Sequence, residues 1–190
     1  MLQLSKLIHL TTGITADGVD CLSAPTEYGN GNAIEVESAI YLYATVLRFN
    51  PTVVVETGTH WGYSSSFILC ALNDKESVYP KNRHLYTIDS SAYEGKPEKL
   101  WANLGVSHLA THFIADSRES GHLIPNDRPI DFLWLDADHS AESVVAEWEQ
   151  FAPRLNPYRA LIGFHDTRLD PREAEGIKQI LRWPWPWAAW

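Results

Sequence analysis

Residues 52–64 read TVVVETGTHWGYS, and this stretch decides the fold. Its three valines form a continuous β-branched run, which is typical of a strand buried on both faces of a parallel sheet. Two glycines, Gly58 and Gly62, follow in a turn, and a helix is predicted over residues 64–72. A buried strand, a short turn and a helix form the first part of a βαβ unit.

The same alternation of strand and helix continues along the chain. Apolar runs predict four more strands, at residues 84–89, 112–115, 130–135 and 159–164. Helical spacing predicts helices at residues 34–47, within 96–104, and at 118–123, 141–155 and 171–181. Five alternating strands predict an α/β fold: a doubly wound, mainly parallel, Rossmann-like sheet with helices on both faces, shortened after the fifth strand.

Length and composition narrow the class of protein. The 190 residues suit one domain, and a 45% hydrophobic content is enough for a core. A net charge of −9 disfavours nucleic acid and anionic membranes as partners. No apolar run approaches the ~18 residues of a transmembrane helix, and the N-terminus does not resemble a signal peptide. The two cysteines have no metal-site spacing, so we expect a cytoplasmic protein.

Acidic side chains stand where the predicted strands end. They are Glu56, Asp89, Asp116, Asp136 and Asp166. Ligands of such sheets bind outside the carboxyl ends of the strands, at the topological switch point. Each acid alone is equally suited to capping the helix that follows it, but five in succession favour a binding site.

The first turn discriminates between classes of ligand. The dinucleotide fingerprint G-x-G-x-x-G is absent, because position 60 is His60 rather than glycine, and this disfavours a nicotinamide enzyme. A loop led by Glu56 suits a ligand with a cationic centre. Asp89, at the end of the second strand, is placed to accept the hydroxyls of a ribose.

Together these segments resemble the S-adenosylmethionine-dependent class I methyltransferases. Residues 53–64 resemble their first motif and residues 87–89 their ribose-binding second motif. The stretches IDFLWLDADHS (130–140) and LIGFHDT (161–167) are similar to the metal-dependent branch related to catechol O-methyltransferase, macrolide sugar O-methyltransferases and cephalosporin hydroxylase-type proteins. The resemblance implies S-adenosylmethionine as the methyl donor and a divalent metal that holds the acceptor hydroxyl.

The resemblance also implies roles for individual residues. At the methionine end of the donor it places Glu56, Gly58, Gly62, Tyr63 and Ser64; at the ribose, Asp89; and at the adenine edge, Asp116 and Ser117. Asp136 and Asp166 match the metal-binding acids, and His165 stands where relatives often have an acid or another ligand.

The metal site also follows from the sheet. Asp136 and Asp166 end strands predicted to be neighbours, about 4.8 Å apart, and two carboxylates that close repel unless a cation or a proton lies between them. Oxygen ligands favour Mg²⁺, and adding His165 shifts the preference toward Mn²⁺. His139, three residues after Asp136, is the predicted base that takes the acceptor's proton; its alternative role is to bond a backbone group at a helix start.

The resulting prediction is an O-methyltransferase of small molecules, with residues 34–182 as the donor-binding domain. The alternatives are a hydroxylase-type relative and a binding protein that keeps the donor pocket without turnover. Residues 1–33 are predicted to form a lead-in or lid. The tail at 183–190 holds four tryptophans and two prolines and is predicted to cover a sheet edge, either of its own chain or of a second copy in a homodimer.

Overall fold

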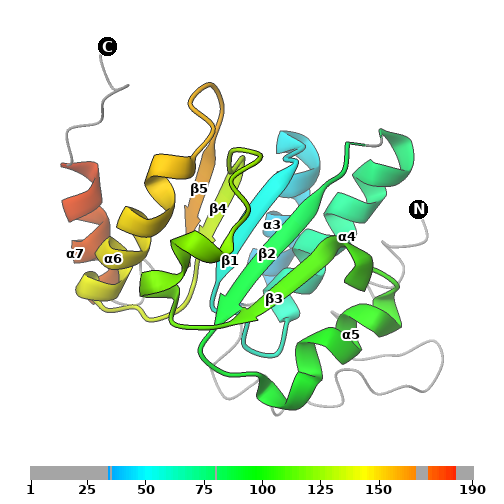
Figure 1. Cartoon of the computed structure of the whole chain (residues 1–190), viewed down its shortest axis with the longest axis horizontal. Coiled ribbons are helices and arrows are strands. Elements are labelled where there is room, and N and C mark those ends of the chain that lie inside the picture. The colour runs from blue at the N-terminus through cyan, green and yellow to red at the C-terminus, as the bar shows by residue number, and fades with distance from the viewer. Residues whose placement is uncertain (1–33, 35, 80, 166–170, 183–190) are drawn as a thin grey trace. The chain divides into compact units, whose positions relative to one another are not determined.

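The structure is a computed structural model that describes residues 34, 36–79, 81–165 and 171–182. Five strands form one sheet in the order β3-β2-β1-β4-β5 (Figure 1). Their bounds are β1 Val53–Thr57, β2 His84–Asp89, β3 Ala110–Ile114, β4 Phe132–Leu135 and β5 Leu161–Phe164. The α-helices are α3 Val36–Phe49, α4 Tyr63–Val78, α5 Lys96–Leu104, α6 Ala141–Phe151 and α7 Pro171–Leu181.

The chain divides into two compact units. The first comprises the chain up to Thr52 with residues 59–85 and 92–111, and so contains α3, α4 and α5. The second comprises residues 53–58, 86–91 and 112–190, and so contains β1, β4, β5, α6 and α7. The predicted lead-in at 1–33 and tail at 183–190, and with them the predicted sheet-edge cover and homodimer contact, lie outside the described residues.

In the first unit, a buried arginine ties the end of α4 to the end of α3. The Arg83 side chain is 1% exposed, and its guanidinium donates to Glu76 at 2.7 Å and to the Asn50 side chain at 2.6 Å. A buried guanidinium needs such acceptors, since it cannot lose its charge. Asn50 has φ 59°, a left-handed conformation that asparagine tolerates, and it follows the last residue of α3.

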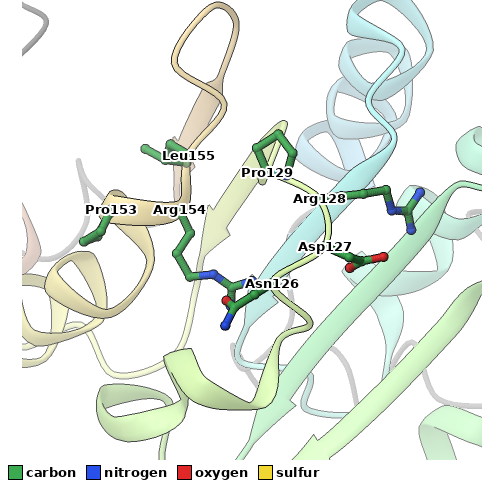
Figure 2. A pocket seen from close by; sticks show the side chains of 7 residues that line it. All are labelled: Asn126, Asp127, Arg128, Pro129, Pro153, Arg154 and Leu155. Carbon is green, nitrogen blue, oxygen red and sulfur yellow. The ribbon is translucent and has the colours of Figure 1, made fainter.

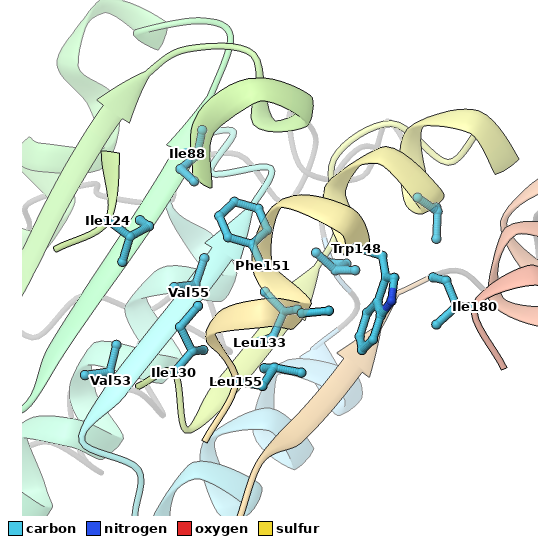
Figure 3. Packing of buried hydrophobic residues seen from close by; sticks show 13 residues of the cluster. Val53, Val55, Ile88, Ile124, Ile130, Leu133, Trp148, Phe151, Leu155 and Ile180 are labelled. Atoms are coloured by element: carbon cyan, nitrogen blue, oxygen red, sulfur yellow. The ribbon is translucent and has the colours of Figure 1, made fainter. Parts of the chain in front are cut away.

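In the second unit, the core lies between the strands and α6. β1 and β4 pair in parallel, as do β4 and β5, and Val55 of β1 is opposite Leu133 of β4. Phe151 and Trp148 of α6 pack against this surface, and Ile180 brings α7 into the same cluster (Figure 3). These helical residues recur every three to four positions, the spacing of an apolar helix face.

The predicted α/β fold and all five strands are confirmed, and the differences have local causes. The helix predicted over 141–155 ends at Phe151, and a 3₁₀ turn covers Ala152–Arg154, because Pro153 has no backbone N–H for the α-helical ladder. The predicted helix over 118–123 is a 3₁₀ helix, Ser117–Leu123. Among the described residues, no helix is both long and apolar enough to cross a membrane.

Candidate active site

The switch point of the second unit lies between β1 and β4. The backbone segments that follow these two strands approach each other closely. Gly58 follows β1 with φ 81°, and its N–H donates to the Ile88 carbonyl at 2.9 Å. A Cβ on Gly58 would lie 1.9 Å from the carbonyl oxygen of Asp136, the residue that follows β4. Only glycine fits here, and the reason is this close approach of two backbones.

Asp136 and His165 meet beyond the ends of β4 and β5. Leu135 is opposite Phe164 in the sheet, and the His165 N–H donates to the Leu135 carbonyl, so the next residue on each strand is also adjacent. His165 Nδ1 lies 3.0 Å from Asp136 Oδ1, and the two side chains are only 11% and 13% exposed. A carboxylate and an imidazole are therefore in contact at the carboxyl ends of β4 and β5.

His139 stands beside that pair and has a buried carboxylate partner. Its Nδ1 lies 2.8 Å from Glu173 Oε2, and its ring centroid lies 6.5 Å from that of His165. Glu173 is in the first turn of α7 and its side chain is 1% exposed, whereas that of His139 is 28% exposed. One ring nitrogen of His139 therefore contacts a buried carboxylate of α7, and the role of His139 as the base stays a prediction.

A second buried carboxylate, Glu147 of α6, holds the strand ends together. It accepts hydrogen bonds from the hydroxyls of Ser117, at 2.5 Å, and Thr57, at 3.1 Å. Thr57 in turn accepts from the Asp136 N–H at 3.3 Å. Burial raises the pKa of Glu147 to about 7, against the opposing effect of the two hydroxyl donors.

Comparison with known proteins identifies the family. Residues 55–167 match a family described as a methyltransferase domain. This chain is a member of that family. Comparison with curated protein sequences gives no significant match.

Solved structures of methyltransferases share the fold. The O-methyltransferase TomG from Streptomyces achromogenes, solved with S-adenosylmethionine, is 18% identical with a TM-score of 0.68, over 95% of this chain and 85% of that one. The Bacillus cereus O-methyltransferase, solved with SAH, is 16% identical with a TM-score of 0.67, over 97% and 80%. A putative caffeoyl-CoA O-methyltransferase from Staphylococcus aureus is 15% identical with a TM-score of 0.69, over 97% and 91%.

The methyltransferase places two of its predicted donor-binding acids inside the second unit. Glu56 is fully buried and accepts a hydrogen bond from the Thr87 hydroxyl at 2.7 Å. Asp89 is the last residue of β2, and its carboxylate accepts the Ser91 N–H at 2.9 Å. Both carboxylates are thereby fixed in orientation.

Asp116 and Ser117, the predicted adenine-edge residues, are engaged within the chain. Asp116 caps the 3₁₀ helix by accepting the Arg118 N–H and also forms an ion pair with the Arg118 guanidinium at 2.6 Å. The Arg118 side chain holds the pKa of Asp116 down at about 2. The Ser117 hydroxyl donates its hydrogen bond to the Glu147 carboxylate.

Gly62, Tyr63 and Ser64 belong to the first unit, at the start of α4. Gly62 has φ 81°, and a Cβ there would lie 3.0 Å from Pro97 and from the Trp101 ring nitrogen, which fixes the approach of α5 to α4. Tyr63 and Ser64 are buried, at 8% and 5% exposure. Their predicted contact with the donor stays a prediction.

The predicted metal site is described in part. Asp166 lies outside the described residues, so the predicted pairing of Asp136 with Asp166 stays a prediction. Within the described chain, no three histidine, cysteine or acidic side chains form a metal-binding group. Asp136 and His165 are the two predicted ligands that the structure brings together.

Glu147 and Glu173 were not predicted from the sequence. Glu147 carried a usable signal, since it stands three residues after Val144 and four before Phe151, on the apolar face of α6. Glu173 had only its place in the first turn of a helix.

A pocket of about 360 Å³ lies near the amino ends of β4 and β5, away from the strand ends described above (Figure 2). Arg154 projects into this region and donates to the carbonyls of Gly121 and Ile124 at 2.7 and 2.8 Å. Its guanidinium therefore holds a loop in place. The pocket contains none of the predicted site residues; it is lined by Asn126, Asp127, Arg128, Pro129, Pro153, Arg154 and Leu155.

Proposed function

We propose that this methyltransferase moves a methyl group from S-adenosylmethionine to a hydroxyl of a small molecule. The family match supports methyl transfer, and the fold is shared with O-methyltransferases solved with S-adenosylmethionine or SAH. The observation that carries the hydroxyl assignment is His139, whose ring is oriented by Glu173 beside Asp136 and His165. A hydroxyl acceptor needs a base, and an imidazole is suited to that role near neutral pH.

In the proposed reaction, His139 takes the proton of the acceptor hydroxyl. The acceptor oxygen forms a bond to the methyl carbon as the carbon–sulfur bond breaks, and the electron pair of that bond stays on sulfur. The products are the methyl ether, S-adenosylhomocysteine and a proton on His139. The positive charge of the donor is lost from sulfur and appears on the imidazole, next to the Glu173 carboxylate.

The donor-binding residues in this proposal are those that the sequence resemblance assigns: Glu56, Gly58, Gly62, Tyr63, Ser64, Asp89, Asp116 and Ser117. Asp89 supports this best, because a buried carboxylate at the end of β2 is suited to accept the two ribose hydroxyls. Asp116 and Ser117 would contribute backbone contacts, since their side chains are engaged with Arg118 and Glu147.

We further propose that Asp136 and His165 hold a divalent ion, with Asp166 as the third ligand. An octahedral ion with ligands at about 2.1 Å places adjacent ligand atoms about 3.0 Å apart, and Asp136 Oδ1 and His165 Nδ1 have that separation. The same separation suits a direct hydrogen bond, so the two residues fit either state. The ion would make an acceptor hydroxyl more acidic; the oxygen ligands favour Mg²⁺ and the imidazole favours Mn²⁺.

The acceptor in this proposal is a small phenol, sugar or polyketide, in a cytoplasmic setting. The net charge of −9 argues against nucleic acid as the acceptor. The varied loops and termini of the fold build acceptor pockets, so the sheet itself does not select among these classes.

The test is transfer of a labelled methyl group from S-adenosylmethionine to a panel of catechol, glycosides and polyketide alcohols. Wild type should label at least one acceptor, and His139→Gln should reduce the rate by about 10²–10⁴-fold, the usual contribution of a general base. A matched control is His108→Gln, since His108 is exposed and lies in the other unit. Unchanged transfer by His139→Gln would contradict the assignment of the base.

A further inference from the structure

We propose that Glu147 of α6 is a positioning residue for the adenine of the donor: its buried carboxylate fixes the segment after β3 by holding the Ser117 hydroxyl against the end of β1. The inference rests on the proposed function, in which Asp116 and Ser117 lie at the adenine edge. It gives a role in donor recognition to a residue outside the set that the sequence resemblance assigns.

The first support is the way in which the two carboxylate oxygens of Glu147 are used. Oε1 accepts a hydrogen bond from the Ser117 hydroxyl at 2.5 Å, and Oε2 accepts one from the Thr57 hydroxyl at 3.1 Å. Glu147 is 1% exposed, and a side chain that served only to fill this space would not need an ionisable group. One buried carboxylate therefore bridges the segment after β3 to the last residue of β1.

The second support is the position of the two hydroxyls in the proposed site. Ser117 is the first residue of the 3₁₀ helix that follows β3, and Asp116 caps that helix. Thr57 ends β1, and its hydroxyl oxygen accepts the Asp136 N–H at 3.3 Å. Glu147 therefore ties the segment assigned to adenine to the ends of the two strands at the switch point.

The third support is that the far end of the same 3₁₀ helix is held by other contacts. The Gly121 N–H donates to the Gln150 side chain of α6 at 3.2 Å, and the Gly121 carbonyl accepts from Arg154 at 2.7 Å. A Cβ on Gly121 would lie 2.8 Å from the Gln150 carbonyl oxygen, so the two backbones are close together. These contacts hold the 3₁₀ helix against α6 independently of Glu147. The Glu147 contact adds control over its first residue, at the adenine edge.

The alternative role for Glu147 is a structural link that stabilises the fold without affecting which donor is bound. In Glu147→Gln, the amide oxygen can accept from one hydroxyl, but the amide NH₂ is a donor and cannot accept from the other. Ser117→Ala removes the same contact from its other side and leaves α6 unchanged. Glu149→Gln is the matched control, because Glu149 is on the same helix and exposed.

The experiment is calorimetric titration of the full chain with two probes at pH 8.5. The probes are S-adenosylhomocysteine and S-inosylhomocysteine, in which hypoxanthine replaces adenine. Burial raises the pKa of Glu147 to about 7, so the carboxylate is ionised at this pH and can accept from both hydroxyls. The ratio of the two dissociation constants reports recognition of the adenine edge, because the rest of each probe is the same.

We expect wild type and Glu149→Gln to bind S-adenosylhomocysteine at least tenfold more tightly than the inosine analogue. In Glu147→Gln and in Ser117→Ala, the affinity for S-adenosylhomocysteine should fall about tenfold, the effect of one displaced hydrogen bond, while that for the analogue changes less than about twofold. The double variant should bind no more weakly than the single variants, because both substitutions remove the same contact.

An unchanged ratio in a folded Glu147→Gln or Ser117→Ala would overturn the inference, and so would equal losses of affinity for the two probes, which a purely structural link would give. Ser117→Ala provides the same test if Glu147→Gln does not fold. A ratio near one in wild type would overturn the inference while leaving donor binding intact. Absence of S-adenosylhomocysteine binding by wild type would instead overturn the proposed function, and the inference with it.

Discussion

Replacing Glu147 with glutamine should make the stability of the methyltransferase less dependent on pH. Glu147 is 1% exposed, and burial raises its pKa to about 7 from an ordinary value near 4.5. Between these two pH values the folded chain holds a proton that the unfolded chain has lost. The stabilisation is therefore complete below about pH 4.5 and is lost as the pH rises through about 7.

The size of the effect follows from that rise in pKa. At 1.36 kcal/mol for each tenfold change in proton affinity, wild type should lose about 3 kcal/mol in total. About 2.5 kcal/mol of this should fall between pH 5 and pH 8.5. Glutamine is close to the shape of the protonated acid and can still accept a hydrogen bond from Ser117 or Thr57. The variant should therefore be more stable relative to wild type at pH 8.5 than at pH 5 by that amount.

The assay is chemical denaturation of wild type and variant across this pH range, followed by tryptophan fluorescence. Taking the difference between the two chains cancels the titration of all other groups, which they share. Glu149→Gln is the control, because Glu149 is on the same helix and exposed. Two parallel stability curves, with a constant difference from pH 5 to pH 8.5, would contradict the raised pKa of Glu147.

Three further predictions concern the strand ends. Asp89→Ala should weaken S-adenosylmethionine binding by about 1–3 kcal/mol in a calorimetric titration, the value of a lost charge-assisted hydrogen bond, and unchanged affinity would remove the ribose assignment. Asp136→Asn or an excess of chelator should abolish labelled methyl transfer while donor binding is retained, and the chelator effect should reverse on adding Mg²⁺; full activity in chelator would mean that Asp136 has another role. Gly58→Ala should lower the unfolding free energy by several kcal/mol more than Gly105→Ala, because both glycines have positive φ but a Cβ meets the Asp136 carbonyl only at Gly58; equal losses in urea denaturation would contradict the close approach.

The strand ends could be predicted from the sequence because a parallel sheet brings them to one edge. The acids at the carboxyl ends of β2 and β4 were predicted in this way. The last helix was predicted with the bounds that the structure has, since Pro171 suits a first helical position. The register of β4 and β5 could not be predicted from the sequence. This register places His165 next to Asp136, and a shift of one residue would bring a different pair of side chains together.

The partners of the two buried glutamates could not be predicted, for another reason. Their roles depend on which helix faces meet in space, and single-chain periodicity reports only that a face is apolar. The apolar face of α6 marks Glu147 as an exception but does not identify Ser117 and Thr57 as its partners. Glu173 contacts His139 because α7 packs against α6. Buried ionisable groups of this kind are visible as exceptions to the apolar pattern, and their partners come from the fold.

Calorimetric titration of the full chain with S-adenosylmethionine, with and without Mg²⁺, tests the central claim most directly. We expect micromolar binding of S-adenosylmethionine or S-adenosylhomocysteine by wild type, with NADH binding much more weakly. Tighter binding of NADH than of S-adenosylmethionine would contradict the assignment of S-adenosylmethionine as the donor.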